Sequence, residues 1–255
     1  MTQKVKMSDA GVGDYWDDLD YIVRNHFTEQ QFVDLELMKK ISDDTPENDA
    51  LLRRFWGGYT QGALTNLVTA IFGGNTAVYS QALYYAWHGI LRYDKGTATV
   101  NLLMNRVSPW MDIDSHIPYE GKATLRNKAA RTALVRIPSW VEARDVKSYA
   151  RNRPIEPGAT GRYLIFESLR PGDEIRLEFP ISEHEDEYTI HGEKFHVTFR
   201  GSTVVDIRPR NSLRSPHSST HTTFYPIYQR ERFRTGPAPS KTLKRFVAEE
   251  LIPLV

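Results

Sequence analysis

The amino-acid sequence predicts a mixed α+β protein in which an N-terminal helical part is followed by an antiparallel β-sandwich. Three observations lead to this fold class. Apolar residues recur at three- and four-residue steps in 14–42 and 76–91, which is the period of a helix. Beyond residue 95, short alternating segments separated by turn residues indicate an antiparallel sandwich or barrel. The length of 255 residues allows two modest domains, each with its own core.

The first predicted helix, residues 14–42, carries a cluster of aspartates in its first turns. Asp14 suits the N-cap position, and negative charge suits the N-terminal end of the helix macrodipole. Two carboxylates three or four residues apart would lie side by side on one helix face, not across a substrate. We therefore interpret the cluster as helix-terminal rather than catalytic. Its members are Asp14, Asp17, Asp18 and Asp20.

The second predicted helix, residues 76–91, is apolar around nearly its whole circumference. This pattern predicts a helix buried between neighbours. The glycine-rich residues 50–75 before it are predicted to be irregular. Since so few helices would not cover residues 76–91, we expect the chain to belong with further helices upstream.

The sandwich is predicted to begin after the turn signal Asp94-Lys95-Gly96, which places a domain boundary near residue 95. The predicted domains are 1–95, 96–207 and a flexible excursion with a tail that packs back, 208–255. The predicted strands are 97–103, 122–126, 132–137, 163–167, 174–179, 187–190, 194–199 and 203–207.

The composition excludes several classes of function. The chain has no cysteine, which excludes disulfides, thiolate metal sites and cysteine nucleophiles. Its formal net charge is +1 and its basic residues are scattered, so we expect neither nucleic acid nor a membrane as a partner. No apolar run approaches the roughly 20 residues of a membrane span. The N-terminus lacks an apolar signal core, which makes the cytoplasm the default expectation.

Three groups of motifs are arranged in the order of one known family. The first group is GVGDYWDD (11–18), RNH (24–26) and EQQ (29–31). The second is IFG (71–73), QALYYAW (81–87), VNLL (100–103) and SPW (108–110). The third is RIPSW (136–140), GRY (161–163) and PGDEI (171–175). Over most of residues 8–190 the chain resembles the C-terminal part of the β-L-arabinofuranosidase-like glycoside hydrolases, family 127 and its uncharacterised relatives.

The resemblance implies an (α/α) barrel of helical hairpins followed by β-sandwich domains. Family members are much longer, so this chain would hold the terminal barrel helices and one following sandwich. In the family, adjacent cysteines after the Ile-Phe-Gly motif supply the nucleophile and, with a glutamate, bind zinc. The corresponding positions here are Gly74 and Asn75, which cannot form a thiolate, and the family's other glutamates would lie upstream. The resemblance thus implies a glycan-degradation protein that is inactive alone, without a metal or cofactor.

Aromatic residues of the second helix are the candidate sugar-binding residues. In a barrel they would point into the central cavity and stack on sugar, and in a plain core they would pack against neighbours; the two readings have equal weight. The candidates are Tyr84, Trp87 and His88, together with Trp110 at the domain junction.

Asp112, Asp114 and His116 are the catalytic candidates, and they are the weaker set. They alternate along the chain, so a strand would place all three on one face. Binding sites often form where domains meet, which is where this stretch is predicted to lie. The favoured alternative is an exposed strand face without chemistry. His26 and Glu29 have the spacing of a metal-ligand pair, but no further ligand pattern supports a metal site.

Two functions are compatible with these observations. The chain is either the C-terminal portion of a glycoside hydrolase-like protein, or a non-catalytic carbohydrate-binding or structural module. Carbohydrate is the expected ligand in both. The second function includes self-association, or association with an N-terminal barrel half, through apolar helix faces that would otherwise be uncovered.

Overall fold

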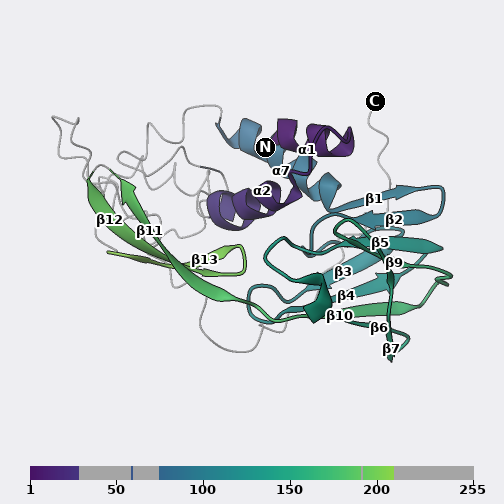
Figure 1. The fold of residues 1–255 in the computed structure, drawn as a ribbon. Helices are drawn as coiled ribbons and strands as arrows, with labels where there is room; N and C mark the ends of the chain where they lie inside the picture. The colour runs from purple at the N-terminus through teal and green to yellow at the C-terminus, as the bar shows by residue number, and fades with distance from the viewer. Residues whose placement is uncertain (29–58, 60–74, 191, 210–255) are drawn as a thin grey trace, which may run out of the picture.

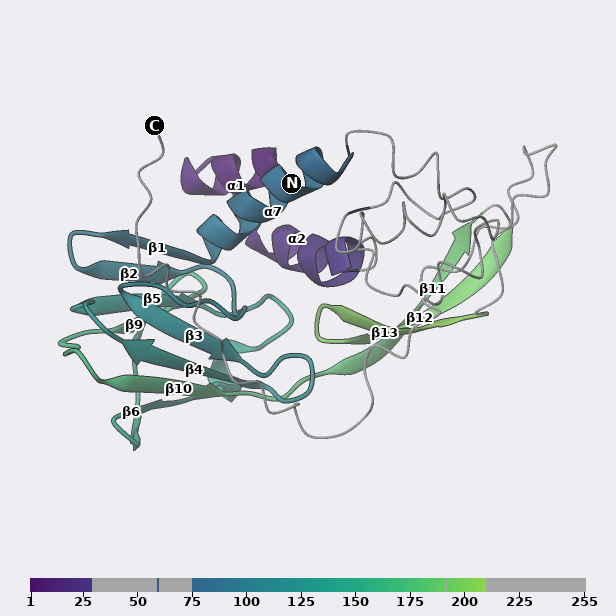
Figure 2. The ribbon, with the colours of Figure 1, turned by 180° about the vertical axis from the view of Figure 1, so that it is seen from behind.

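The computed structural model describes residues 1–28, 59, 75–190 and 192–209, and its elements form a layer of helices, a two-sheet sandwich and a separate small sheet (Figure 1). The helical segments are α1 (Thr2–Asp9), α2 (Trp16–Tyr21), the π-helical η1 (Ile22–Phe27) and α7 (Asn75–Ile90). Both views show the helices against one end of the sandwich, with the small sheet beside η1 (Figures 1 and 2).

Two five-stranded sheets make the sandwich. In spatial order, the first sheet consists of β1 (Leu91–Asp94), β2 (Thr97–Val100), β5 (Thr132–Arg136), β9 (Tyr163–Phe166) and β8 (Gly158–Thr160). The second consists of β3 (Met111–Ser115), β4 (Lys122–Asn127), β10 (Glu174–Glu178), β6 (Lys147–Ala150) and β7 (Arg153–Ile155), with the short η2 (Ala143–Asp145) before β6. The third sheet consists of β11 (Glu183–Ile190), β12 (Glu193–Arg200) and β13 (Thr203–Arg208).

Each predicted strand corresponds to an observed strand, and the predicted turn before residue 97 is confirmed as the β1–β2 hairpin. Lys95 and Gly96 have φ values of 46° and 90°, and positive φ at both central residues is the geometry of a tight two-residue hairpin. One pairing corrects the expectation of an antiparallel sandwich, because β2 and β5 are parallel. After β2 the chain crosses to the second sheet and forms β3 and β4. It then returns to the first sheet, where β5 runs in the same direction as β2.

Five strands were not predicted, namely β1, β3, β6, β7 and β8. They are three to five residues long. Every residue of β7 and β8 is exposed, so these strands have no apolar alternation to detect. Strand β1 follows α7 directly and begins four residues ahead of the predicted boundary at 95.

The helices and the sandwich share one hydrophobic core. Inward-facing residues of both sheets pack with Trp16 and Leu19 of α2 and with Ile90 of α7 in a single cluster. A Cβ added at Gly89 would lie 2.9 Å from the Trp16 ring, so glycine lets α2 approach α7 closely. Burying side chains such as Leu19 contributes about 2 kcal/mol each, which ties the helical layer firmly to the sandwich.

The aspartate cluster joins the helical layer to the sandwich. Arg136, at the end of β5, has a side chain only 3% exposed, and it forms ion pairs with Asp14 at 2.8 Å and Asp17 at 2.5 Å. The Ser139 amide also donates to Asp17 Oδ1 at 2.9 Å. Burial raises the pKa of Asp17, but the hydrogen bonds from Arg136 and Ser139 outweigh it and hold the pKa below its usual value. Asp14 Oδ1 accepts from the Trp16 amide at 3.2 Å, in line with the helix-terminal interpretation.

The third sheet is fastened to η1 through Asn25. The Asn25 side chain donates to the Ser202 carbonyl at 2.7 Å and accepts from the Val204 amide at 2.8 Å, so it bonds to β13 as a strand partner would. Asp20 also accepts a short hydrogen bond from the Ser202 hydroxyl. The predicted single domain 96–207 therefore consists of a sandwich that ends near residue 179 and a sheet anchored on the helices.

The helical predictions have mixed outcomes. Helix α7 is confirmed to within one residue, whereas α1 was not predicted. Several apolar residues of α7 are exposed in this chain, namely Val78 at 65%, Tyr84 at 58% and Trp87 at 44%, which agrees with the expectation that so few helices do not cover it. The described helices do not close into an (α/α) barrel, so the barrel stays a prediction. Residues 29–58 and 210–255, which include about half of the first predicted helix and most of the tail, lie outside the described ranges. Among the residues that the structure describes, no helix combines the length and apolarity needed to cross a membrane.

Candidate functional site

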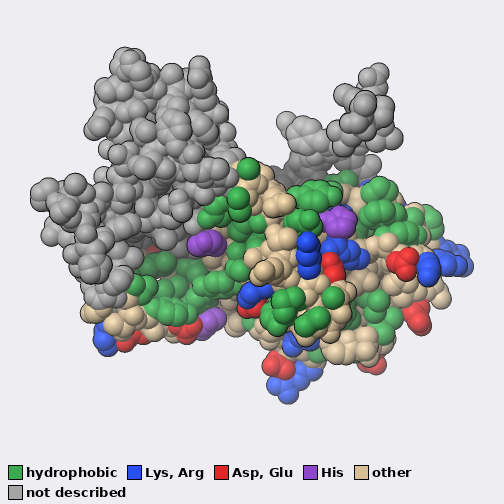
Figure 3. Space-filling model, turned by 90° about the horizontal axis from the view of Figure 1, so that it is seen from above, with side chains coloured by type: hydrophobic (Ala, Val, Ile, Leu, Met, Phe, Trp, Pro, Cys, Tyr) green, Lys and Arg blue, Asp and Glu red, His purple; other side chains and the backbone are tan. Residues whose placement is uncertain are grey.

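Two pockets flank the C-terminal half of α7, and they divide the four predicted sugar-binding residues between them. Tyr84 and Trp87 line one pocket, whereas His88 and Trp110 line the other. Seen from the helical side, hydrophobic side chains gather on this part of the surface among basic and acidic ones (Figure 3).

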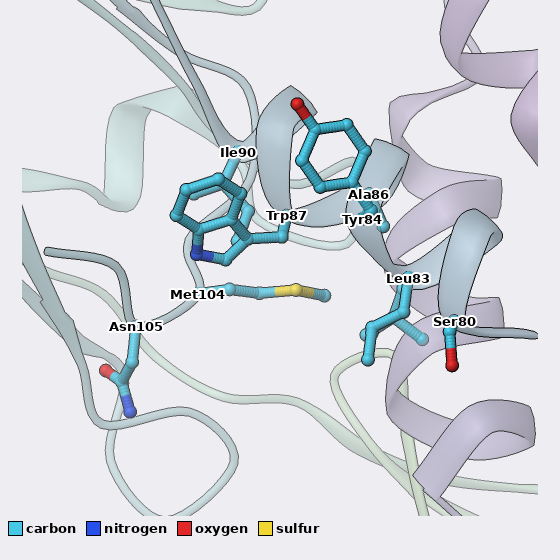
Figure 4. A pocket seen from close by; sticks show the side chains of 9 residues that line it. Ser80, Leu83, Tyr84, Ala86, Trp87, Ile90, Met104 and Asn105 are labelled. Atoms are coloured by element: carbon cyan, nitrogen blue, oxygen red, sulfur yellow. The ribbon is translucent and has the colours of Figure 1, made fainter. Parts of the chain in front are cut away.

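The first pocket, here called the apolar pocket, has a volume of about 480 Å³. In the close view, Trp87 and Met104 point into one space, with Ser80 and Asn105 at its ends (Figure 4). Asn105 Oδ1 already accepts from the Ser115 amide at 2.7 Å. Few polar groups thus remain to recognise a hydroxyl-rich ligand. The full lining is Val23, Ser80, Leu83, Tyr84, Ala86, Trp87, Ile90, Met104 and Asn105.

The second pocket, here called the edge pocket, has a volume of about 670 Å³ and lies beside the β1–β2 hairpin. Tyr93 and Trp110 form an aromatic pair there, with ring centroids 5.1 Å apart and planes only 7° from parallel. Trp110 immediately precedes β3, so the pair joins the edge strands of the two sheets. The full lining is His88, Leu91, Arg92, Tyr93, Asp94, Lys95, Thr97, Thr99 and Trp110.

Polar side chains are set in register along the edge pocket. Arg92 is opposite Thr99 and Asp94 is opposite Thr97 in the antiparallel ladder. Residues two apart on a strand share a face, so a cation, a carboxylate and two hydroxyls lie on one face of the hairpin. This side of the pocket offers both hydrogen-bond donors and acceptors.

His88 is a neutral hydrogen-bond donor in the edge pocket. Burial lowers its pKa below the usual value, and the neighbouring Arg92 and Arg106 lower it further. Arg92 bonds to His88 Nδ1. A guanidinium can only donate, so Nδ1 accepts and the proton of the neutral ring is on Nε2. Arg92 is itself held by Asp9, with Nε to Oδ1 at 3.2 Å.

Arg106 lies between the two pockets, and sequence reasoning did not single it out. It is 4% exposed, and its Nη1 donates to the carbonyls of Trp87, His88 and Leu91 at 2.8 to 2.9 Å. It thereby satisfies the free carbonyls at the C-terminal end of α7, where positive charge is favoured. Its guanidinium also lies 4.4 Å from the Trp87 ring centroid. Burial, and then the Arg92 charge, lower its pKa to about 10.

Asp112 and Asp114 lie on β3 and His116 follows its last residue, and none of the three lines either pocket. Asp112 is buried, accepts from the Ser108 amide at 3.1 Å and forms an ion pair with Lys128. Asp114 Oδ2 lies 3.9 Å from His116 Nε2. The strand presents a structural ion pair and a loose carboxylate–histidine contact rather than two carboxylates facing a cavity.

The remaining candidates lie partly outside the described ranges. Asn75 is the first residue of α7, while Gly74 and Glu29 are outside. Among the described residues, no group of three or more histidine, aspartate or glutamate side chains could hold a metal ion.

No model of a known protein family matches this sequence, and no curated protein sequence matches it. Among solved structures, the chain is similar to several glycoside hydrolases, which are carbohydrate-active enzymes. The GH127 β-L-arabinofuranosidase of Geobacillus stearothermophilus T6 is 17% identical, with a TM-score of 0.36, over 49% of this chain and 23% of that one. A second GH127 β-arabinofuranosidase is 16% identical, with a TM-score of 0.42, over 53% and 26%. A structure described as a glycoside hydrolase is 16% identical, with a TM-score of 0.41, over 53% and 25%. This chain thus spans about a quarter of the length of each, and GH127 is the family that the sequence motifs resemble.

Proposed function

We propose that this chain is the C-terminal portion of a glycoside hydrolase-like protein associated with glycan degradation, and that it binds carbohydrate in the edge pocket without hydrolysing it alone. The observation that carries the proposal is the stacked Tyr93–Trp110 pair in a pocket that also presents charged, hydroxyl and imidazole groups. The order of the sequence motifs supports the glycoside hydrolase part of the proposal.

The chemistry of a sugar matches the edge pocket better than the apolar pocket. A sugar ring has apolar C–H faces that pack on aromatic rings, while its hydroxyls need donors and acceptors around the rim. Trp110 and Tyr93 supply the aromatic rings. Asp94 and Thr97 supply hydrogen-bond acceptors and donors. The apolar pocket has aromatic rings but few free polar groups.

Catalysis by the described residues lacks its usual pair of acids. Glycoside hydrolysis needs two carboxyl groups about 5 to 9.5 Å apart across the scissile bond. In the edge pocket, Asp94 is the one carboxylate among the lining residues. Asp112 forms an ion pair with Lys128, and Asp14 and Asp17 form ion pairs with Arg136. The proposal therefore assigns binding, and not bond cleavage, to this chain.

Calorimetric titration of the purified chain with arabinose-containing oligosaccharides tests the proposal. Replacing Trp110 by alanine is expected to weaken binding about tenfold, since an aromatic stacking contact contributes about 1 to 1.5 kcal/mol. Tyr188→Ala is the matched control, because it removes an aromatic ring, 42% exposed, from the distant strand β11. Equal binding by the wild type and Trp110→Ala would place the sugar elsewhere. Release of arabinose from arabinofuranosides by the chain alone would overturn the non-catalytic assignment.

Self-association is the second candidate function, and the exposed face of α7 favours it. Tyr84 and Trp87 are exposed beside the apolar pocket. We propose a second copy of this chain as the occupant, because an apolar face of this kind is covered in stable assemblies. Light scattering across a concentration series is expected to show a dimer that Tyr84→Ser weakens. A monomer at every concentration would remove this candidate.

A further inference from the structure

We infer that the edge pocket prefers an acidic sugar, a hexuronate, over the neutral sugar of the same shape. This inference rests on the proposed binding of carbohydrate at the edge pocket. It comes from the imbalance between positive and negative groups in and directly beneath the pocket.

The lining of the pocket supplies the first part of the imbalance. Arg92 and Lys95 are positive and Asp94 is negative. Arg92 is neutralised by Asp9, through Nη2 to Oδ2 at 2.5 Å. Lys95 has no ion-pair partner among the residues that the structure describes, and the positive φ of the hairpin places it at an exposed turn. Its ammonium group is therefore available to a ligand.

Arg106 supplies the second part from beneath the pocket. It donates to the carbonyls of His88 and Leu91, and both of these residues line the pocket. Its bonding partners in the described part of the chain are carbonyl oxygens, and its buried Nε has no partner there. A buried guanidinium without a counter-charge projects its field further than a solvated one, because the medium around it has a low dielectric constant.

Arg131 adds a further positive charge at the hairpin. Its Nη2 donates to the Lys95 carbonyl at 3.1 Å, and its guanidinium lies against Gly96. Together with Lys95 and Arg106 it gives this region more positive than negative groups. Since Asp9 is paired with Arg92, Asp94 is the one carboxylate of the lining that remains, and it does not balance these three positive charges.

Neutral donors in the pocket suit a carboxylate as well. The Nε2–H of His88 has no acceptor among the described residues, and it can donate to a carboxylate oxygen. The carboxylate of a uronate resting on Trp110 can therefore accept from His88 at the α7 end of the pocket or pair with Lys95 at the hairpin end. A neutral hydroxymethyl group at the same place would gain a hydrogen bond but no charge interaction.

The test compares D-galacturonate, its methyl ester and D-galactose in ligand-detected NMR titrations of the intact chain at low salt. The ester keeps the shape of the acid and removes its charge. We expect galacturonate to bind about fivefold more tightly than its ester, the ratio for one unit-charge pair about 4 Å apart in water. We expect the ratio to fall as salt is raised, because the groups are partly exposed. Equal or weaker binding of galacturonate would overturn the inference.

Two substitutions assign the effect to the pocket. Lys95→Met should lower the ratio of galacturonate affinity to methyl ester affinity towards one, because both ligands then meet an uncharged side chain at this position. Arg153→Met is the matched control, since it removes one positive charge from the exposed edge strand β7 of the other sheet and should leave the preference intact. A preference unchanged in Lys95→Met, or lost equally in Arg153→Met, would refute the inference. Equal binding of all three sugars, weakened by Trp110→Ala, would overturn the inference and leave the proposed function standing. Binding of none of the three would overturn the inference, and failure to bind the arabinose-containing oligosaccharides as well would overturn the proposed function.

Discussion

Replacing Arg136 by methionine tests whether the helical layer is clamped to the sandwich by charge. The substitution keeps most of the apolar stem and removes two ion pairs, to Asp14 and Asp17. Removing one partner of a fully buried pair costs about 3 to 5 kcal/mol. Here the aspartate side chains are 48% and 33% exposed, so water would solvate them in part. We therefore expect a loss of about 2 to 3 kcal/mol in the free energy of unfolding.

Urea unfolding followed by tryptophan fluorescence measures this loss. Trp16 is buried beside the clamp and reports on the contact between helices and sandwich. Arg126→Met is the matched control, because Arg126 is 55% exposed and its pair with Glu174 spans 3.5 Å. That control should cost less than about 0.5 kcal/mol. A double-mutant cycle with Asp17→Asn isolates the coupling between Arg136 and Asp17.

The pH dependence of stability gives an independent check. The pKa of Asp17 is lowered in the folded protein from an ordinary value of 3.8. Its contribution to stability is therefore present above that value and is lost as pH falls through the folded pKa. Asp17→Asn should flatten this acid loss. A coupling energy near zero, or the same acid loss in Asp17→Asn, would refute the clamp.

Two further changes test the packing and polar contacts of the sandwich. Gly121→Ala should destabilise the fold by about 3 kcal/mol, because the new Cβ would lie 1.8 Å from the Phe179 carbonyl oxygen. Calorimetry measures this loss, and an unchanged melting temperature would contradict the prediction. Tyr163→Phe should cost about 1 kcal/mol, since the Tyr163 hydroxyl donates to buried Asn101 at 2.7 Å. Burial raises the pKa of Tyr163 to about 12. The free energy of unfolding of the wild type should therefore fall as pH rises from 10 towards 12. Denaturant titrations should show a smaller fall in Tyr163→Phe.

The sequence by itself determined the local elements with a strong apolar period. The strands around residues 132–136 and 174–178 alternate between buried and partly buried positions, and the helical period of residues 76–91 corresponds to α7, so local pattern and observed structure agree there. Strands β7 and β8 have no such pattern, because pairing with neighbouring strands alone makes them strands. Of the candidate site, the aromatic residues Trp87 and Trp110 were recognisable as pocket residues from type and position, but their separation into two pockets was not.

Only the tertiary structure decided which distant groups meet. Asp14 and Arg136 are 122 residues apart in sequence, and nothing in either neighbourhood marks them as partners. Arg106 reads as one scattered basic residue, yet it ends α7 and lies beneath the edge pocket. Side-chain period reports how a segment alternates between core and solvent, which is a local property. The pairing of charges and the formation of a pocket depend on the path of the chain between sheets, and the crossover from β2 to β3 that sets this path leaves no local signal.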